Sequence, residues 1–498
     1  MKGVAACLLA LPAVATAFSP SFQPSKSATV ALRTRRAAPL RAVALPSDAT
    51  KADERGPLEA QDAWIANVDL DAFGRDVKAL GKRLEKAQGE DDVNHIKKIC
   101  LWSNTCAAVG LATMWMQPNP ISVFALSLWT LSRWTTIAHH TNHGGYNNAD
   151  KTRYFNSKGF AIGFKARVTQ WFDWMLPEAW NVEHNNLHHY RLSEADDPDL
   201  VERNLGIIRN APLPKIFKYV AVGFLMCTWK WFYYAPNTYK ELKIQQMRRA
   251  GKTFTEEDGV DEAFTMKAFL DGTARKRNWF SFPEFFGKVV GPYLIGHFLL
   301  LPLPMLALSS AGVLPAAAFK NSVISLLLAD VVTNIHAFIV IATNHAGKDL
   351  YTFSHGCAPN SGTFYMRQVA SSANFRTGGD LNDFMHGWLN YQVEHHMWPQ
   401  LSALSYQRSQ PEVKALCEKH GIPYTQESVW IRLKKTVDIM TGDATQRPYP
   451  PAYELQKDLM VWNSNKADSV AARKTVEEIN SNILGDAKFK EASESVTA

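Results

Sequence analysis

The sequence lacks several features that would assign it to a common class. Its six cysteines are scattered with no C-x-x-C pair, which excludes a disulfide framework and a cysteine-based zinc or iron–sulfur site. Lysine and arginine are dispersed, and no basic stripe with interleaved aromatics indicates a nucleic-acid partner. The net charge of +7 is small for 498 residues, and His-Pro-Gly-Gly does not occur. Any metal-binding or catalytic site must therefore be built from residues other than cysteine.

Acidic residues are absent from the first 47 positions. Lys2 precedes an apolar run that ends in small residues at Ala15 to Ala17, as in a signal peptide. A basic stretch rich in serine and alanine follows, which an ordinary secreted protein would not explain. The Ala17-Phe18 junction resembles the cleavage motif of proteins sent to the complex plastids of algae. We therefore predict that residues 1–47 are a bipartite plastid-targeting segment and that the protein resides in a plastid membrane.

Four uncharged or nearly uncharged runs are each long enough to cross about 30 Å of hydrocarbon as a helix. They are Ile99–Met116, Ile121–Ala138, Val289–Leu308 and Val323–Ala342. Sharp turns within each pair predict two hairpins. The expected fold class is an all-α integral membrane protein, with four transmembrane helices and a histidine-rich aqueous cap on one face.

The remaining segments are polar or short. Residues 48–98 form a polar region with an amphipathic helix expected over Ala60–Gln88. Tyr219–Trp229 is too short to span and is flanked by lysines and aromatics, which favours an interfacial helix. The membrane domain is expected over residues 99–430, followed by a polar C-terminal tail, 431–498. Asp330 and His336 lie in the last span, where a charge indicates either a protein interior or helix packing.

Three histidine clusters stand out. Two follow the first hairpin, His139-His-Thr-Asn-His143 and His184-Asn-Asn-Leu-His-His189, and the third, Gln392-Val-Glu-His-His396, follows the second. Residues four apart share a helix face, so the spacing pairs His139 with His143 and His184 with His188, with His189 turned aside. Neighbouring side chains diverge by about 100°, so an adjacent pair such as His395-His396 can reach two metal ions. Each hairpin returns the chain to one side, which places all three clusters on one membrane face.

Imidazole coordination suits iron, copper, nickel or zinc, and seven clustered histidines exceed the needs of one zinc ion. Two redox-capable ions beside an apolar cavity suit oxygen activation and attack on an unactivated C–H bond of a lipid chain. Nearby carboxylates are candidates to orient the rings: Glu183, Glu394, Asp196, Asp197 and Asp199. A metal transporter is the non-enzymatic alternative, but it would need ligands at mid-membrane rather than at span ends.

The boxes H-x-x-x-H, H-x-x-x-H-H and Q-x-x-H-H resemble those of the membrane fatty-acid desaturase superfamily. The third resembles the front-end acyl-lipid branch, and Thr343-Asn-His-Ala-Gly347 resembles the place of a further histidine ligand. Box two departs from that branch, which usually has two residues rather than three between its first histidines. The resemblance covers about residues 99–430.

The resemblance implies two iron ions, molecular oxygen as co-substrate and a membrane lipid as substrate. The implied metal ligands are His139, His143, His184, His188, His189, His345, His395 and His396, with Gln392 as a polar neighbour or weak ligand. Without the fused haem domain marked by His-Pro-Gly-Gly, electrons must come from a separate carrier, and ferredoxin is the expected one. A di-iron hydroxylase or ketolase acting on a lipid or carotenoid is the enzymatic alternative.

Overall fold

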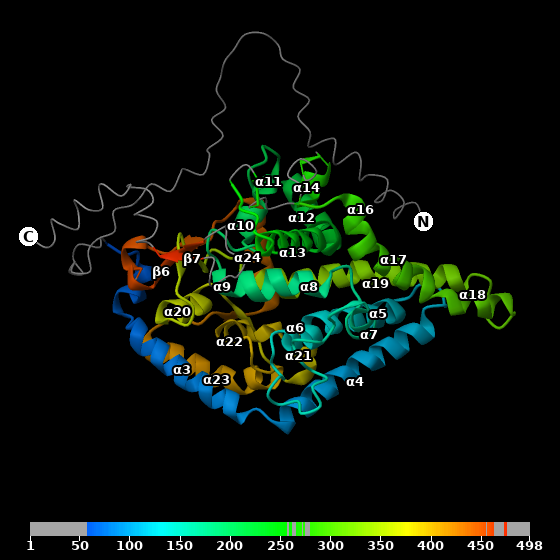
Figure 1. Cartoon of the computed structure of the whole chain (residues 1–498), viewed down its shortest axis with the longest axis horizontal. Helices are drawn as coiled ribbons and strands as arrows, with labels where there is room; N and C mark the ends of the chain where they lie inside the picture. Colours follow the sequence, from blue (N-terminus) through cyan, green and yellow to red (C-terminus); the bar gives the residue numbers. More distant parts are fainter. Residues whose placement is uncertain are drawn as a thin grey trace, which may run out of the picture. The chain divides into compact units, whose positions relative to one another are not determined.

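A computed structural model describes residues 57–255, 258–260, 265–270, 272–273, 279–454, 456–462 and 473–475 (Figure 1). The expected targeting segment, residues 1–47, lies outside the described residues. Within the described residues the secondary structure is mainly helical, with a few strands of two to four residues.

Helices from the first half of the chain are α3 (Leu70–Ala87), α4 (Glu90–Thr113), α5 (Pro120–Ser132), α6 (His139–Asn142), α7 (Phe164–Gln170), α8 (Pro177–Trp180), α9 (His189–Arg191), α10 (Val201–Asn204), α11 (Gly206–Arg209), α12 (Lys215–Trp229) and α13 (Ala235–Arg249). Those of the second half are α14 (Thr265–Leu270), α16 (Phe282–Phe285), α17 (Gly291–Ile295), α18 (Leu303–Ser310), α19 (Ala318–Ile341), α20 (Gly362–Ala370), α21 (Asp380–Met385), α22 (Gln392–Met397), α23 (Ala403–His420) and α24 (Val429–Thr441).

Wider π-helical turns continue several helices: η3 (Arg133–Ala138), η4 (Asn181–His188), η5 (Lys230–Tyr234), η7 (Phe286–Val290) and η8 (Gly296–Leu300). The 3-10 helices are η2 (Ala60–Asn67), which has eight residues, and the single turns η9 (Ala342–Asn344), η10 (Leu389–Tyr391), η11 (Pro451–Tyr453) and η12 (Gln456–Asp458).

The strands pair segments that are distant in sequence. β1 (Tyr351–Thr352) lies parallel to β5 (Arg447–Pro448), and β3 (Asn374–Phe375) lies parallel to β4 (Gln426–Glu427). β2 (Gly356–Cys357) and β7 (Arg473–Thr475) flank β6 (Leu459–Trp462) in an antiparallel sheet. These pairs tie the segments between α19 and α22 to the C-terminal part of the chain.

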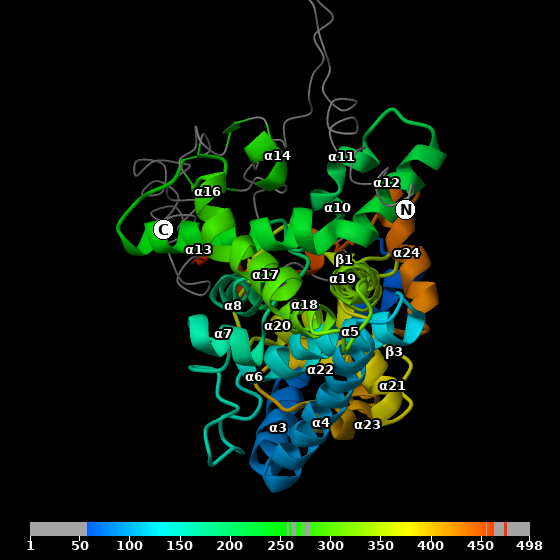
Figure 2. The same ribbon diagram turned by 90° about the vertical axis from the view of Figure 1, so that its right-hand side faces the viewer.

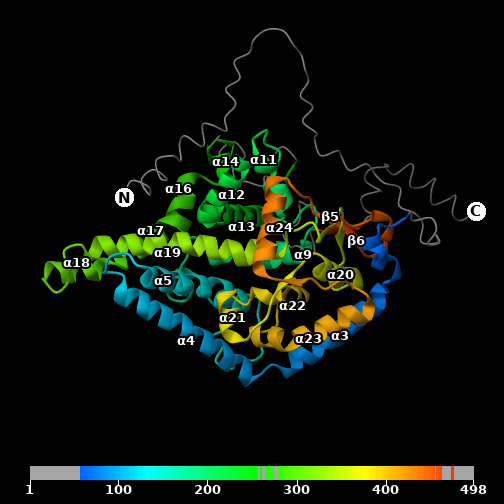
Figure 3. The same ribbon diagram turned by 180° about the vertical axis from the view of Figure 1, so that it is seen from behind.

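Two of the four expected spans coincide with long apolar helices. Two continuous helical stretches have the length and apolarity of a membrane span: Phe282–Ser310, with a mean hydropathy of 1.7, and Ala318–Asn344, with 2.0. The other two runs form the hairpin of α4 with α5, and α5 packs on α19 (Figures 1 and 3). A mostly helical fold with long apolar helices and a buried histidine cluster confirms the expected fold class.

The expected amphipathic helix is α3, and the Asp69 side chain caps it by accepting from the backbone N–H of Ala72. Its inner face buries Phe73, Val77 and Leu84 at the helical spacing of an amphipathic segment. α3 packs on α20 and α23, so a helix from the N-terminal region covers segments next to the third histidine cluster (Figures 1 and 2).

The folded part continues past residue 430. α24 crosses that position and packs on α12, and β5 extends the pairing further. The Arg432 side chain is fully buried and donates to the backbone oxygens of Thr343 and Ala346. The polar composition of residues 431–498 predicted a trailing surface segment. Composition alone does not distinguish a solvated arginine from one that binds buried backbone carbonyls.

α12 carries the apolar surface expected of an interfacial helix. Ile216, Phe217 and Val220 are exposed, whereas Val222 and Trp229 on the opposite side are buried. The buried side is held to α19, because the indole of Trp229 donates to the backbone oxygen of Asn334 at 3.0 Å. This arrangement fits a helix that rests on the membrane surface.

Candidate metal centre

Eight histidines converge in two groups of ring nitrogens. The five-histidine group is His139, His143, His184, His189 and His395. The three-histidine group is His188, His345 and His396. Within each group the candidate ligand atoms lie within 4.8 Å of one another. The structure thus brings together all eight histidines implied by the resemblance, from segments that lie on one side of the two hairpins.

Adjacent histidines separate between the groups as the helical geometry predicts. His395 belongs to the five-histidine group and His396 to the three-histidine group, and His189 and His188 divide in the same way. The rings of a neighbouring pair therefore lie in different groups, as expected from the divergence of adjacent side chains on a helix.

Box two brings together more rings than the expected pair. His184 groups with His189, five residues on, and in a further group it lies with His188 and Asp199. Asn181–His188 is a π-helix, whose i to i+5 repeat is wider than that of an α-helix, so a residue five positions on reaches the same face as one four positions on. The His184 and His188 rings still stack at 5.3 Å between centroids. The extra residue in box two is accommodated by this wider turn.

Hydrogen bonds fix the tautomers of two rings in the five-histidine group. His139 Nδ1 lies 3.1 Å from the backbone oxygen of Thr135, which can only accept, so Nδ1 carries the proton. His395 Nδ1 lies 3.3 Å from the Tyr406 hydroxyl, which itself donates to the Trp398 backbone oxygen at 2.9 Å. Both Nε2 atoms therefore present lone pairs, and they face each other at 3.0 Å. Two facing lone pairs need a cation between them.

The three-histidine group is built in the same way. His345 Nδ1 donates to the Ser371 backbone oxygen at 3.2 Å, and His188 Nδ1 donates to Asp197 at 2.9 Å. His345 Nε2 then faces His396 Nε2 at 3.1 Å. The amide of Gln392 lies 2.8 Å from the same His345 nitrogen, at the edge of the group, where the resemblance placed a polar neighbour.

These separations fit metal coordination. Two nitrogens bound at about 2.1 Å and about 90° apart are about 3.0 Å from each other. His139 Nε2 is 3.0 Å from His184 Nε2 as well as from His395 Nε2. Burial and neighbouring imidazoles hold the pKa of His184 and of His395 well below the usual range, so the rings are neutral ligands. The donor set therefore fits two transition-metal ions.

One of the candidate carboxylates orients a ring directly. Asp197 is buried and accepts from His188 Nδ1 and from the backbone N–H of Ser193. Burial raises the pKa of Asp197, but His188 outweighs it and the net pKa is lowered, which keeps the carboxylate ionised. A charged acceptor on Nδ1 makes the opposite nitrogen a stronger metal ligand.

Three of the other candidate carboxylates, Glu183, Asp199 and Glu394, form no hydrogen bond to a ring nitrogen of either histidine group within the described residues. Asp199 lies 3.9 Å from His188, and Glu183 accepts from the Tyr234 hydroxyl. Glu394 accepts from Asn374 and Tyr424. Asp196 lines a polar pocket beside these groups, together with Glu183, Asp199, Arg203 and Lys240.

Several positioning contacts could not be read from the sequence motifs. Arg432 holds the backbone on both sides of Asn344 and His345, and it also pairs with Asp349 at 2.8 Å. The side chain of Gln446 donates to the His345 backbone oxygen at 3.0 Å. These residues belong to segments up to one hundred positions away, and the burial of a lone arginine leaves no local pattern.

Histidines without a matching role lie outside both groups. His140 donates from Nδ1 to the Thr136 backbone oxygen and stacks on His139, so it supports a neighbour. His386 donates to the Asn382 backbone oxygen, and His336 donates to that of Met385. Asp330, the charge inside the last span, accepts from Tyr293 and Trp174 at 2.9 Å each and joins helix packing.

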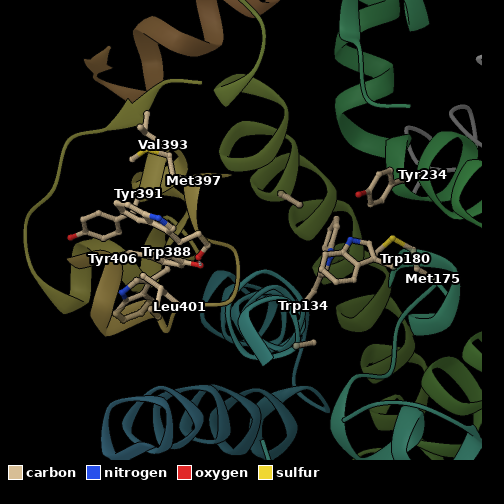
Figure 4. Close-up of a cluster of buried hydrophobic side chains, with 14 of the residues drawn as sticks. Trp134, Met175, Trp180, Tyr234, Trp388, Tyr391, Val393, Met397, Leu401 and Tyr406 are labelled. Atoms are coloured by element: carbon tan, nitrogen blue, oxygen red, sulfur yellow. Dashed lines mark hydrogen bonds between the residues drawn. The ribbon is translucent and has the colours of Figure 1, made fainter. Parts of the chain in front are cut away.

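Aromatic side chains contact the histidines, with Trp180 on His139 and His184 and Tyr406 on His395. Trp180 stacks on His184 with 4.5 Å between ring centroids, and Trp134 and Tyr234 lie on the same side of the core (Figure 4). Trp388, Tyr391 and Tyr406 come from the segments around box three (Figure 4). Such a setting limits the access of water to the cluster.

Comparison with known proteins decides the family. The profile of the fatty acid desaturase family matches residues 113–428, which include all eight histidines. The chain belongs to the fatty acid desaturase family. It is therefore a membrane-associated desaturase oxidoreductase, and a fatty acid is the substrate that the family implies.

Relatives agree with this assignment. An NADPH-dependent stearoyl-CoA 9-desaturase of Mycobacterium tuberculosis is 22% identical over 383 residues, covering 75% of this chain and 80% of the relative. Delta(8)-fatty-acid desaturase 2 of Arabidopsis thaliana is 33% identical over 108 residues, 20% of this chain and 23% of the relative. An acyl-lipid (7-3)-desaturase of Rebecca salina is 40% identical over 76 residues, 15% and 17% of the two chains. No solved structure gives a significant match.

Proposed function

We propose that this desaturase holds two iron ions with the eight histidines and uses oxygen to introduce a double bond into a lipid-linked acyl chain. The facing Nε2 lone pairs of His139 and His395, at 3.0 Å, are the observation that carries the proposal. When bound, the two ions supply the redox chemistry that activates oxygen for C–H cleavage. Oxygen takes two hydrogen atoms from the acyl chain, two electrons from an external donor and two protons from solvent, and it leaves as two waters.

The protein's own contribution is ligand geometry and exclusion of water. Backbone carbonyls and Asp197 hold the Nδ1 protons of His139, His345 and His188, so that the Nε2 atoms of these three rings point inward. Trp180 and Tyr406, which lie against the rings, limit water around a reactive oxidant. Gln392, at 2.8 Å from His345, is placed to tune the three-histidine group.

A lipid-linked substrate, rather than a thioester, is the finer part of the proposal. It rests on the Q-x-x-H-H box, and acyl-lipid desaturases with short matching segments support it. The plastid location rests on residues 1–47 alone. Ferredoxin as donor follows from that location and from the absence of a His-Pro-Gly-Gly motif in the chain.

Lipid profiling of a host that expresses the full chain tests the proposal. Wild type and His396→Ala are compared in a host with defined acyl lipids and carotenoids. We expect a product two hydrogens lighter in the acyl-lipid pool with wild type only. A product that gains one oxygen, with no new unsaturation, would instead indicate the hydroxylase or ketolase alternative. New unsaturation confined to the thioester pool would contradict a lipid-linked substrate.

A further inference from the structure

The outer face of α3 carries a row of exposed lysine and arginine side chains that point away from the core. Arg75, Lys78, Lys82 and Lys86 follow at helical spacing and are all exposed, opposite the buried Phe73, Val77 and Leu84. We name these four residues the α3 basic face. Most rows of exposed lysines on a helix are simply solvated. The α3 basic face differs in its ion pairing and in its position beside the third histidine box.

The ion pairs of α3 use its other charges. Asp71 pairs with Lys457 at 2.8 Å, Asp76 with Lys419 at 2.7 Å, and Arg83 with Glu412. Among the described residues, no carboxylate forms an ion pair with Lys78, Lys82 or Lys86. Three neighbouring like charges on a helix repel one another, and this repulsion destabilises the helix slightly. A bound partner of opposite charge would offset the repulsion.

The inner side of α3 lies directly on the third histidine box. A methyl group on Gly81 would lie 2.3 Å from Nε1 of Trp398, so only glycine lets the helix backbone meet this indole. Trp398 is buried and follows His396 by two residues. Its backbone oxygen accepts from the Tyr406 hydroxyl at 2.9 Å, and that hydroxyl lies 3.3 Å from His395 Nδ1. A short series of contacts therefore links the α3 basic face to the five-histidine group.

We propose that the α3 basic face is the docking surface of an acidic one-electron carrier protein. The inference rests on the proposed function, because oxygen-dependent desaturation needs two external electrons. The carrier binds twice in each turnover, is oxidised by one electron each time, and leaves the electron near Trp398, from which the contacts through Tyr406 lead to His395. Complementary charge gives such an encounter its rate and its dependence on salt.

The test uses the iron-loaded full chain in nanodiscs of neutral phosphatidylcholine, with acidic [2Fe–2S] ferredoxin as the probe. The variant Lys78→Glu/Lys82→Glu/Lys86→Glu is compared with a control of equal charge change, Lys151→Glu/Lys158→Glu/Lys165→Glu, whose lysines are exposed on another segment. A milder triple change to glutamine guards against misfolding. Double-bond formation is measured against ferredoxin concentration, and separately with reduced methyl viologen, a small cation that needs no docking surface.

We expect the glutamate variant of α3 to raise the KM for ferredoxin at least tenfold and to abolish its salt dependence. The rate with viologen should change less than twofold, and the control should resemble wild type. Direct binding of oxidised ferredoxin to the nanodiscs should weaken at least tenfold, a result that does not require turnover. Absence of turnover with every reductant would count against the proposed function, whereas the binding measurement would still decide the docking surface.

Unchanged KM and unchanged binding in the α3 variant would overturn the proposal. So would an equal loss in the control variant, or full turnover with NADPH alone. If the face instead contacts an anionic membrane, the viologen-driven rate of wild type, but not of the variant, would depend on the content of anionic lipid in the nanodisc. That outcome would also overturn it.

Discussion

The two histidine groups differ in how fully the protein surrounds each metal position. The five-histidine group draws ligands from all three boxes, and its rings crowd one another. The three-histidine group has fewer rings, an amide from Gln392 at its edge and a carboxylate behind His188. Metal sites with few protein ligands keep open positions for a reactant. If the two groups hold the two proposed ions, the ion at the three-histidine group has more coordination positions left for oxygen or water.

Loss of a ligand should have the largest effect. His188→Ala or His143→Ala is expected to lower activity more than about 100-fold, because even outer partners cost about 10–100-fold. His188→Ala should also release metal from the three-histidine group first, since only His345 and His396 remain there. Activity assays with iron determination on the same samples check both statements. Activity above about a tenth of wild type in either variant would remove that residue from the ligand set.

Loss of the Asp197 carboxylate, which accepts from His188, is expected to have the second-largest effect on activity. Asp197→Asn removes the charge that strengthens this ligand, and activity should fall about 10–100-fold. Glu394→Gln is the matched control, because Glu394 is equally buried but accepts from Asn374 and Tyr424 rather than from a ring. We expect the control to change activity less than about threefold at equal protein yield. Similar losses in both variants would mean that burial, not ring orientation, explains the effect.

Arg432 should have a smaller, more selective effect on the three-histidine group. Arg432→Lys keeps the charge but loses the planar fork that binds two backbone oxygens around His345. We expect activity to fall about tenfold, with the spectroscopic signal of one iron altered and the other unchanged. Arg447→Lys is the control, since Arg447 pairs with Asp62 and Glu59 away from the histidines. Equal disturbance of both iron signals would contradict a specific role.

Histidines outside both groups should matter least. His420 pairs with Asp76 at 2.9 Å, and because the Asp76 carboxylate is exposed, solvent screens the pair and it contributes little to stability. His420→Ala and His386→Ala are therefore expected to keep activity within about twofold of wild type. A loss comparable to that of His143→Ala would show that the two groups do not contain all the functional histidines.

Much of this arrangement follows from local patterns. The apolar runs predicted the two hairpins, and helix periodicity predicted that His395 and His396 diverge toward different groups. The partnership of His184 with His189 did not follow, because a π-helical turn is set by packing and has no sequence period. The roles of Arg432, Gln446 and Tyr406 did not follow either. Each acts through a long-range contact that no spacing within its own segment marks.

Iron determination on the purified full chain tests the central claim most directly. The account predicts about two irons per chain in two inequivalent sites by Mössbauer spectroscopy, as expected for five and three imidazole ligands. One zinc ion per chain with little iron, or a single type of iron site, would contradict it.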